Sequence, residues 1–174
     1  MSILPLLLLA QTAAAAPPPR IDCNDADHRA LDFWVGEWAV IDTASGADVA
    51  RSRIARGPGG CSITEDYRQT VGPGAKPIDY HGQSFTAFNS GDQRWRQLYV
   101  DTSGAAFAYD GGFEGPALML TARAGALGSR MSIAPQSDGT VRQLGWKTSD
   151  AGKSWQPNYD FTYRPLNPQA RATH

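Results

Sequence analysis

Metal-binding and redox-active residues are scarce in this sequence, whose 174 residues include two cysteines and three histidines. The cysteines do not form a Cys-x-x-Cys pair, which argues against disulfide-exchange catalysis. The three histidines, His28, His81 and His174, are scattered without the spacing of metal ligands. We therefore expect no metal site and no cofactor.

Other absences exclude further classes of protein. Lysine and arginine are dispersed and nearly balanced by acidic residues, giving a formal net charge of −1, so nucleic acid is not an expected partner. No apolar run reaches the length of a membrane span. The sequence contains no Gly-x-Ser-x-Gly elbow, no phosphate-binding glycine loop and no His-Glu-x-x-His, which removes the enzyme classes that depend on them.

The N-terminus has the features of an export signal. A short apolar run at residues 3–10 leads to small residues ending at Ala16, which predicts a signal peptide over residues 1–16. A tail anchored by this run is the alternative, although no lipidation cysteine follows it closely. We expect a periplasmic or secreted protein, and in that oxidising environment Cys23 and Cys61 are expected to form a disulfide.

The remaining chain suits one domain. Residues 17–28 are expected to form an extended arm, residues 29–165 the domain, and residues 166–174 a flexible tail. Helix-capping residues at 24–27 precede apolar residues at helical spacing, which predicts a helix of about two turns ending at Gly36. Gly36-Glu37-Trp38 is typical of a lipocalin opening, in which the tryptophan plugs one end of a barrel. The tripeptide alone does not exclude the alternative, an aromatic core cluster that happens to include a glycine.

Strand patterns alternate with turn residues from Val35 onward, and no helical segment interrupts them. This succession predicts an all-β fold: an antiparallel up-and-down barrel of about ten strands, lipocalin-like, with the short N-terminal helix closing one end. A β-sandwich is the alternative, but it usually needs longer crossover connections. The candidate strands are 35–43, 48–56, 61–70, 79–88, 94–101, 105–111, 117–124, 129–135, 141–148 and 155–164.

Alternation within the strands indicates which side chains face inward. The aromatic faces are the expected interior, and they carry Glu65 beside Tyr67 and Gln97 between two aromatic residues. A packed core excludes such groups, because burying them unpaired costs about 1–3 kcal/mol each. Either a cavity or an internal hydrogen-bond network would accommodate them, and the sequence leaves both open. The predicted ligand-binding residues are Trp38, Glu65, Tyr67, Trp95, Gln97 and Tyr99.

Residues 148–155 match the Asp-box pattern of a hydroxyl residue, Asp, Gly, a second hydroxyl residue and Trp at fixed spacing. In that pattern the carboxylate accepts turn amides, the glycine takes a positive φ angle and the tryptophan packs beneath the hairpin. Sialidases carry such boxes away from their catalytic residues. We expect Asp150, Gly152 and Trp155 to form a structural hairpin.

Four segments together, at residues 31–38, 60–65, 95–101 and 149–155, resemble the bacterial domain-of-unknown-function family numbered 1579. The resemblance covers residues 29–165 and implies a secreted or cytoplasmic lipocalin-like barrel without an established activity. More remotely, the chain is similar to nitrobindin-type ten-stranded barrels, which hold haem through a histidine near the C-terminal end. His81 lies in the fourth candidate strand instead, so we do not expect this chain to bind haem as those barrels do.

These patterns favour a binding protein over an enzyme. We expect the barrel to bind a small, mostly apolar or amphipathic molecule in its interior. The alternative is a small-barrel enzyme of the isomerase or cyclase type, in which Glu65 and neighbouring tyrosines are the acid–base groups. The sequence does not indicate an oligomeric state.

Overall fold

A computed structural model describes residues 23–167 of the chain. The predicted signal peptide, residues 17–22 of the predicted arm and residues 168–174 of the predicted tail lie outside the described residues. Ten strands make up most of the described chain. They are β1 (Gly36–Asp42), β2 (Asp48–Arg56), β3 (Ile63–Val71), β4 (Pro77–Asn89), β5 (Arg94–Asp101), β6 (Ala106–Glu114), β7 (Ala117–Ala124), β8 (Leu127–Pro135), β9 (Val141–Thr148) and β10 (Gln156–Pro165).

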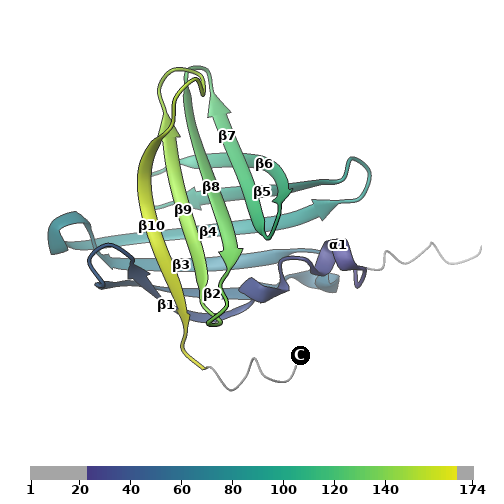
Figure 1. The fold of residues 1–174 in the computed structure, drawn as a ribbon, viewed down its shortest axis with the longest axis horizontal. Coiled ribbons are helices and arrows are strands. Elements are labelled where there is room, and N and C mark those ends of the chain that lie inside the picture. Colours follow the sequence, from purple (N-terminus) through teal and green to yellow (C-terminus); the bar gives the residue numbers. More distant parts are fainter. Residues whose placement is uncertain (1–22, 168–174) are drawn as a thin grey trace, which may run out of the picture.

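Each strand pairs antiparallel with the next one in the sequence, and β1 pairs with β10 to close the barrel (Figure 1). The predicted all-β up-and-down barrel of ten strands is confirmed, and the β-sandwich alternative is wrong. In Figure 1, β7 to β10 cross β2 to β6 at a steep angle. Closure gives every strand two neighbours, which leaves no sheet edge along most of the wall.

The segment before β1 differs from the predicted two-turn helix. It forms one helical turn, α1 (Ala26–Arg29), and then a separate 3₁₀ turn, η1 (Asp32–Trp34). Asp25 caps α1, because its side chain accepts a hydrogen bond from the backbone N–H of His28. Residues three apart share one side of a 3₁₀ turn, so the break lets Leu31 and Trp34 both be fully buried.

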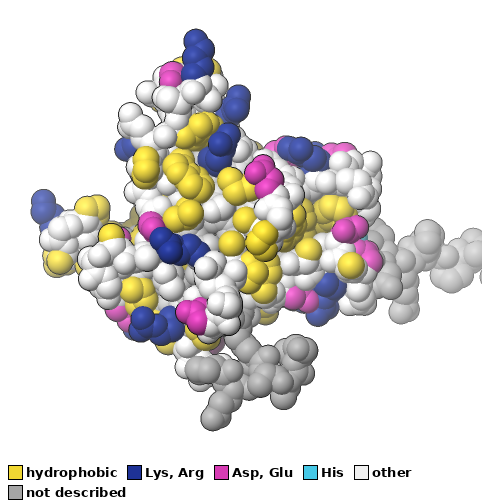
Figure 2. Space-filling view, viewed as in Figure 1, with side chains coloured by type: hydrophobic (Ala, Val, Ile, Leu, Met, Phe, Trp, Pro, Cys, Tyr) yellow, Lys and Arg dark blue, Asp and Glu magenta, His cyan; other side chains and the backbone are white. Residues whose placement is uncertain are grey.

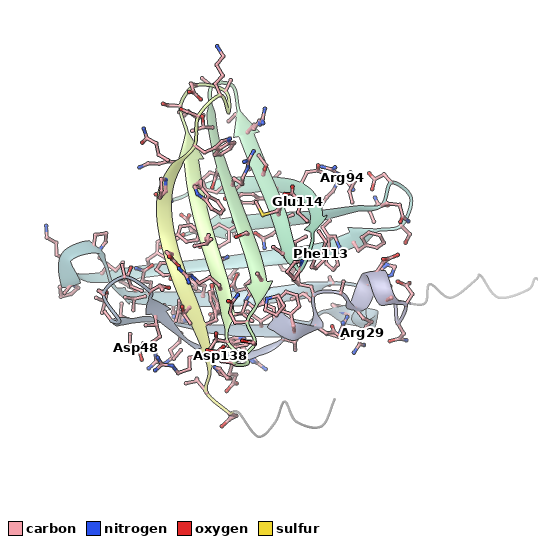
Figure 3. All side chains as sticks on the ribbon, viewed as in Figure 1. Arg29, Asp48, Arg94, Phe113, Glu114 and Asp138 are labelled. Atoms are coloured by element: carbon pink, nitrogen blue, oxygen red, sulfur yellow. A yellow bond between two sulfur atoms is a disulfide. The ribbon has the colours of Figure 1, made fainter. Side chains whose placement is uncertain are left out.

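The two ends of the barrel are built differently. Successive connections of an up-and-down barrel alternate between its ends, so the β1–β2, β3–β4 and β5–β6 turns share one end. The other end receives α1, η1 and the β2–β3 and β4–β5 turns, and its interior is filled by Leu31, Trp34, Trp38 and Trp95. Figure 3 shows this separation, with Asp48 on one side of the view and Arg29 and Arg94 on the other. We refer to the second end as the packed end.

A disulfide ties the N-terminal segment to the packed end. Cys23 is bonded to Cys61, which lies in the β2–β3 connection just before β3, and the Cα atoms are 5.0 Å apart. Both cysteines of the chain are thereby used, which confirms the predicted bond. Cys23 and α1 fall within the segment predicted as an extended arm, so ordered structure begins earlier than residue 29.

The β9–β10 turn is organised by one carboxylate. Asp150 accepts hydrogen bonds from the backbone N–H of Ser154 at 2.9 Å and from the hydroxyls of Ser154 and Thr148, both at 2.6 Å. These hydrogen bonds lower the pKa of Asp150 well below its usual value. Gly152 has a φ angle of +84°, and Trp155 packs under the guanidinium of Arg130, 4.2 Å from the ring centroid.

We expect Asp150→Ala to lower the melting temperature by about 3–6 °C, because it leaves a turn amide and two hydroxyls without their acceptor. Thermal unfolding followed by circular dichroism measures this effect. Ligand affinity should stay the same, because the interactions of Asp150 are within its own turn. A loss of affinity at unchanged melting temperature would show that the carboxylate serves binding instead.

Candidate functional site

The barrel is hollow at the end opposite the packed one. A cavity of about 890 Å³ occupies its interior there and is bounded by side chains from all the strands except β7 and by the β1–β2 and β3–β4 turns. The turn residues Ser45, Pro73 and Ala75 mark its mouth. Ligand cavities typically measure about 300–1,000 Å³, so the space is large enough for a small organic molecule.

Tyrosine dominates the lining of this cavity. All six tyrosines of the chain contribute to it, together with Phe107 and Phe161. None of the five tryptophans, all within the described residues, belongs to the lining. The two kinds of large aromatic side chain are thus separated: indoles pack elsewhere, and phenols border the empty space. The tyrosines are Tyr67, Tyr80, Tyr99, Tyr109, Tyr159 and Tyr163.

Two glycines allow tyrosine rings to lie flat against the wall. A Cβ atom added to Gly82 would lie 1.9 Å from the hydroxyl oxygen of Tyr99, and one added to Gly145 would lie 2.2 Å from the ring of Tyr159. Both distances are too short for non-bonded atoms, so any larger residue would push the ring into the cavity. These glycines therefore help to keep the interior open.

Glu65 is buried in the wall of the cavity, with 6% of its surface exposed. Its Oε1 accepts hydrogen bonds from the hydroxyl of Ser52 at 2.8 Å and from that of Tyr163 at 3.3 Å. Tyr163 is also 2.8 Å from Oε1 of Gln143. Burial raises the pKa of Glu65 to about 7, although the hydrogen bonds from Ser52 and Tyr163 oppose the shift. The carboxyl group therefore exchanges its proton near neutral pH.

Gln97 presents an unsatisfied polar group at the same cavity. Its side-chain nitrogen donates to the hydroxyl of Thr86 at 2.9 Å, but its oxygen has no partner among the described residues. Only 3% of the residue is exposed. Rotating the amide would leave the nitrogen unpartnered instead, so either orientation leaves one group to be satisfied by an occupant.

A chain of hydroxyls leads from the cavity to its mouth. The Tyr99 and Tyr80 hydroxyls are 2.6 Å apart, and Tyr80 donates to Asp101 at 3.0 Å. Burial raises the pKa of Tyr80 to about 12. Burial also acts to raise the pKa of Asp101, but hydrogen bonds from Ser103 and Tyr80 outweigh it and lower the pKa overall. Asp101 is therefore a carboxylate at neutral pH.

A second hollow, of about 670 Å³, adjoins the cavity at the side of the barrel. β6 pairs with β7 only between Asp110 and Glu114, so the two strands diverge beside residues 106–109. The hollow lies in this divergence and shares Phe107, Ser129 and Asn158 with the main cavity. Leu127, which is 63% exposed, also borders it, so this hollow opens to the surface.

The structure separates the predicted ligand-binding residues into two groups. Glu65, Tyr67, Gln97 and Tyr99 line the cavity. Trp38 and Trp95 do not: the Trp38 indole donates to the backbone oxygen of Trp34 at 3.0 Å, and Trp95 packs on Phe88 with ring centroids 5.7 Å apart. Both tryptophans belong to the packed end. The ring of Trp38 contacts that of Tyr163, which does line the cavity, with centroids 6.2 Å apart.

Several lining residues were not among the predicted ones: Tyr80, Asp101, Tyr109, Gln143, Tyr159 and Tyr163. For the four tyrosines among them, the signal in the sequence is that every tyrosine of the chain falls on a strand. Asn158 is a different case, because strict alternation in β10 turns it away from the side of Tyr159. The register of β10 against β9 shifts between Pro157 and Tyr159, and this irregularity brings both Asn158 and Tyr159 to the cavity.

Within residues 23–167, no three His, Cys, Asp or Glu side chains are grouped so that they could hold a metal ion. No helix in that part of the chain is long and apolar enough to cross a membrane. Comparison of the sequence with protein-family models found no match, and no curated protein matches it either. The resemblance to family 1579 therefore rests on the motifs in the sequence and stays a prediction.

Proposed function

We propose that this protein is an exported, lipocalin-like barrel that binds a small, mostly apolar molecule in its interior. The observation that carries the proposal is the cavity: one end of the barrel is tightly packed, while the other holds about 890 Å³ of space lined by aromatic rings. An apolar body would replace water on these rings, and a polar end would meet Gln97 or Glu65.

The lipocalin-like assignment is supported by the Gly-x-Trp step. Gly36 has a φ angle of +150°, which a residue with a side chain rarely adopts. An added Cβ there would lie 3.6 Å from the ring of Trp38, so the indole packs over the glycine at the start of β1. α1 belongs to the same end, where His28 contacts Phe88 with ring centroids 5.3 Å apart. We assign α1, η1 and the indole together as the closure of that end.

Export is supported by the disulfide, because such bonds persist in oxidising compartments. The apolar run and small residues of the N-terminus provide the second argument. We therefore propose a periplasmic or secreted location.

A neutral apolar dye tests binding in the interior. We expect Nile red to bind in a 1:1 ratio and to be displaced by whatever molecule the purified protein retains. Ala47→Trp should weaken binding at least about tenfold, because Ala47 lines the mouth and an indole there would obstruct it. Fluorescence titration measures the affinity of the dye for the unaltered protein and for the variant.

Ala44→Trp is the matched control for this experiment. Ala44 lies in the same β1–β2 turn, but it is exposed and outside the lining, so the dye should bind this variant like the unaltered protein. Absence of dye binding, or equal weakening by the two variants, would contradict binding in the interior.

An acid–base enzyme is the second candidate, and the position of Glu65 favours it. A carboxyl group whose pKa is about 7 can both donate and accept a proton at neutral pH. The two candidates differ in what happens to a molecule retained by the purified protein. Recovery of the molecule unchanged after incubation supports binding, whereas its conversion, lost in Glu65→Gln, supports an isomerase or cyclase.

A further inference from the structure

The charges that border the cavity are all of one sign. Its lining contains Asp42, Glu65 and Asp101, and no lysine, arginine or histidine among the described residues. The chain as a whole has 16 lysines and arginines, so this bias does not reflect composition. Figure 2 shows Lys and Arg side chains spread over the outer surface of the view. The side hollow differs from the cavity, because Arg123 and Lys147 border it.

The aromatic lining has the same electrostatic preference. The face of an aromatic ring is the negative part of its quadrupole and attracts cations. Eight such rings surround the cavity, and Tyr67 and Tyr80 meet edge to face with centroids 6.1 Å apart. Burial is the largest cause that raises the pKa values of four tyrosines, and the negative charge of Glu65 raises them further. These tyrosines are Tyr67, Tyr99, Tyr159 and Tyr163. Four rings therefore lie within electrostatic reach of this carboxyl group.

Glu65 has no cationic partner among residues 23–167. The hydrogen bonds that it makes within the described residues both end on Oε1, which leaves Oε2 without a donor. A buried carboxylate normally requires a paired charge, because desolvation penalises its ionised form. A positively charged occupant would supply that partner.

We propose that the occupant is an organic cation, an ammonium group on an apolar body, whose charged centre lies beside Glu65 among the tyrosine rings. This inference rests on the proposed binding function and specifies the ligand. A fatty acid or other organic anion is disfavoured, because it would add a negative charge to a space that already holds three carboxyl groups.

Three probes with one apolar body test the sign of the charge: 2-naphthylmethyl-trimethylammonium, the neutral 2-naphthalenemethanol and the anionic 2-naphthylacetate. Titration calorimetry at pH 8.5 should show the ammonium binding at least about tenfold more tightly than the alcohol, with the anion weakest. A quaternary ammonium has no N–H group, so its advantage over the alcohol reports charge and not hydrogen bonding.

Glu65→Gln should remove most of this advantage while the affinity for the alcohol changes less than about twofold. Asp66→Asn is the matched control: Asp66 is the next residue, its side chain is 43% exposed, and it contacts His81 and Arg68 on the outer surface. This variant changes the net charge equally and should leave all three affinities unaltered.

The unaltered protein provides a test that does not depend on a variant folding. Of the other titratable groups that line the cavity, the six tyrosines have raised pKa values and stay neutral over pH 5.5–8.5. Asp42 and Asp101 have lowered pKa values and stay ionised over the same range. The ammonium should therefore bind about tenfold more weakly at pH 5.5, where Glu65 is protonated, than at pH 8.5. The affinity for the alcohol should be flat over this range.

The outcomes separate the inference from the proposed function. If the alcohol binds as tightly as the ammonium, or Glu65→Gln leaves the preference unchanged, the cation inference is wrong while the binding function stands. If none of the three probes binds and Nile red does not bind either, both proposals are wrong.

Discussion

Glu65→Gln is expected to stabilise the folded protein by up to about 3 kcal/mol at pH 8.5 and to leave its stability nearly unchanged at pH 4. The pKa of Glu65 is about 7 in the folded state, against 4.5 for an unperturbed glutamate. The folded protein therefore holds this proton more tightly than the unfolded chain. Below pH 4.5 both states are protonated, and the residue carries no ionisation penalty.

Between pH 4.5 and 7 the unfolded chain releases the proton first, so the stability contributed by this residue falls as pH rises. Above about pH 7 Glu65 is ionised in both states, and the folded protein carries the full cost of burying that charge. Glutamine cannot ionise, so position 65 causes no fall in the stability of the variant as pH rises. Urea unfolding at pH 4, 5.5, 7 and 8.5 measures the difference, and Asp66→Asn should not reproduce it. Parallel pH profiles for Glu65→Gln and the unaltered protein would show that Glu65 titrates normally.

Removal of the disulfide is expected to cost about 3–4 kcal/mol of stability. The Cys23–Cys61 bond joins residues 38 positions apart, and without it the unfolded chain gains the conformational freedom of that loop. A double Cys23→Ser and Cys61→Ser variant measures the loss by urea unfolding. Affinity for Nile red should persist, because the bond lies at the packed end, away from the mouth.

Dithiothreitol supplies the control for this prediction. It should destabilise the unaltered protein by a similar amount and have no effect on the double variant. Equal unfolding curves with and without the reductant, in the presence of demonstrably reduced thiols, would contradict a stabilising role for the bond.

The strands could be predicted closely because local chemistry marks their ends. β2, β5, β7 and β9 begin and end where turn residues and alternation place them. Alternation also identified the inner face of β3 and β5, which brings Glu65, Tyr67, Gln97 and Tyr99 to the cavity. Closure through β1 and β10 followed from the number of strands and the shortness of their connections.

Depth along the barrel could not be predicted, because alternation specifies a face and not a level. Trp95, Gln97 and Tyr99 share one face of β5, yet Trp95 lies at the packed end and the other two border the cavity. Trp95 lies near the start of β5, where it packs on its cross-strand neighbour Phe88, whereas Gln97 and Tyr99 lie further along the strand. The irregularity at Pro157 and Tyr159, which admits Asn158, depends on the pairing of β10 with β9.

The pairing of β1 with β10 has a consequence for the order in which the protein can form. Every other strand pair joins neighbours in the sequence, so these hairpins can assemble as the chain is synthesised. β1 pairs with residues from Phe161 to Pro165, and it therefore waits for nearly the whole chain before gaining its second neighbour. During that interval its free edge is available to other chains. The first strand to emerge is thus the one that most needs protection until the last one arrives.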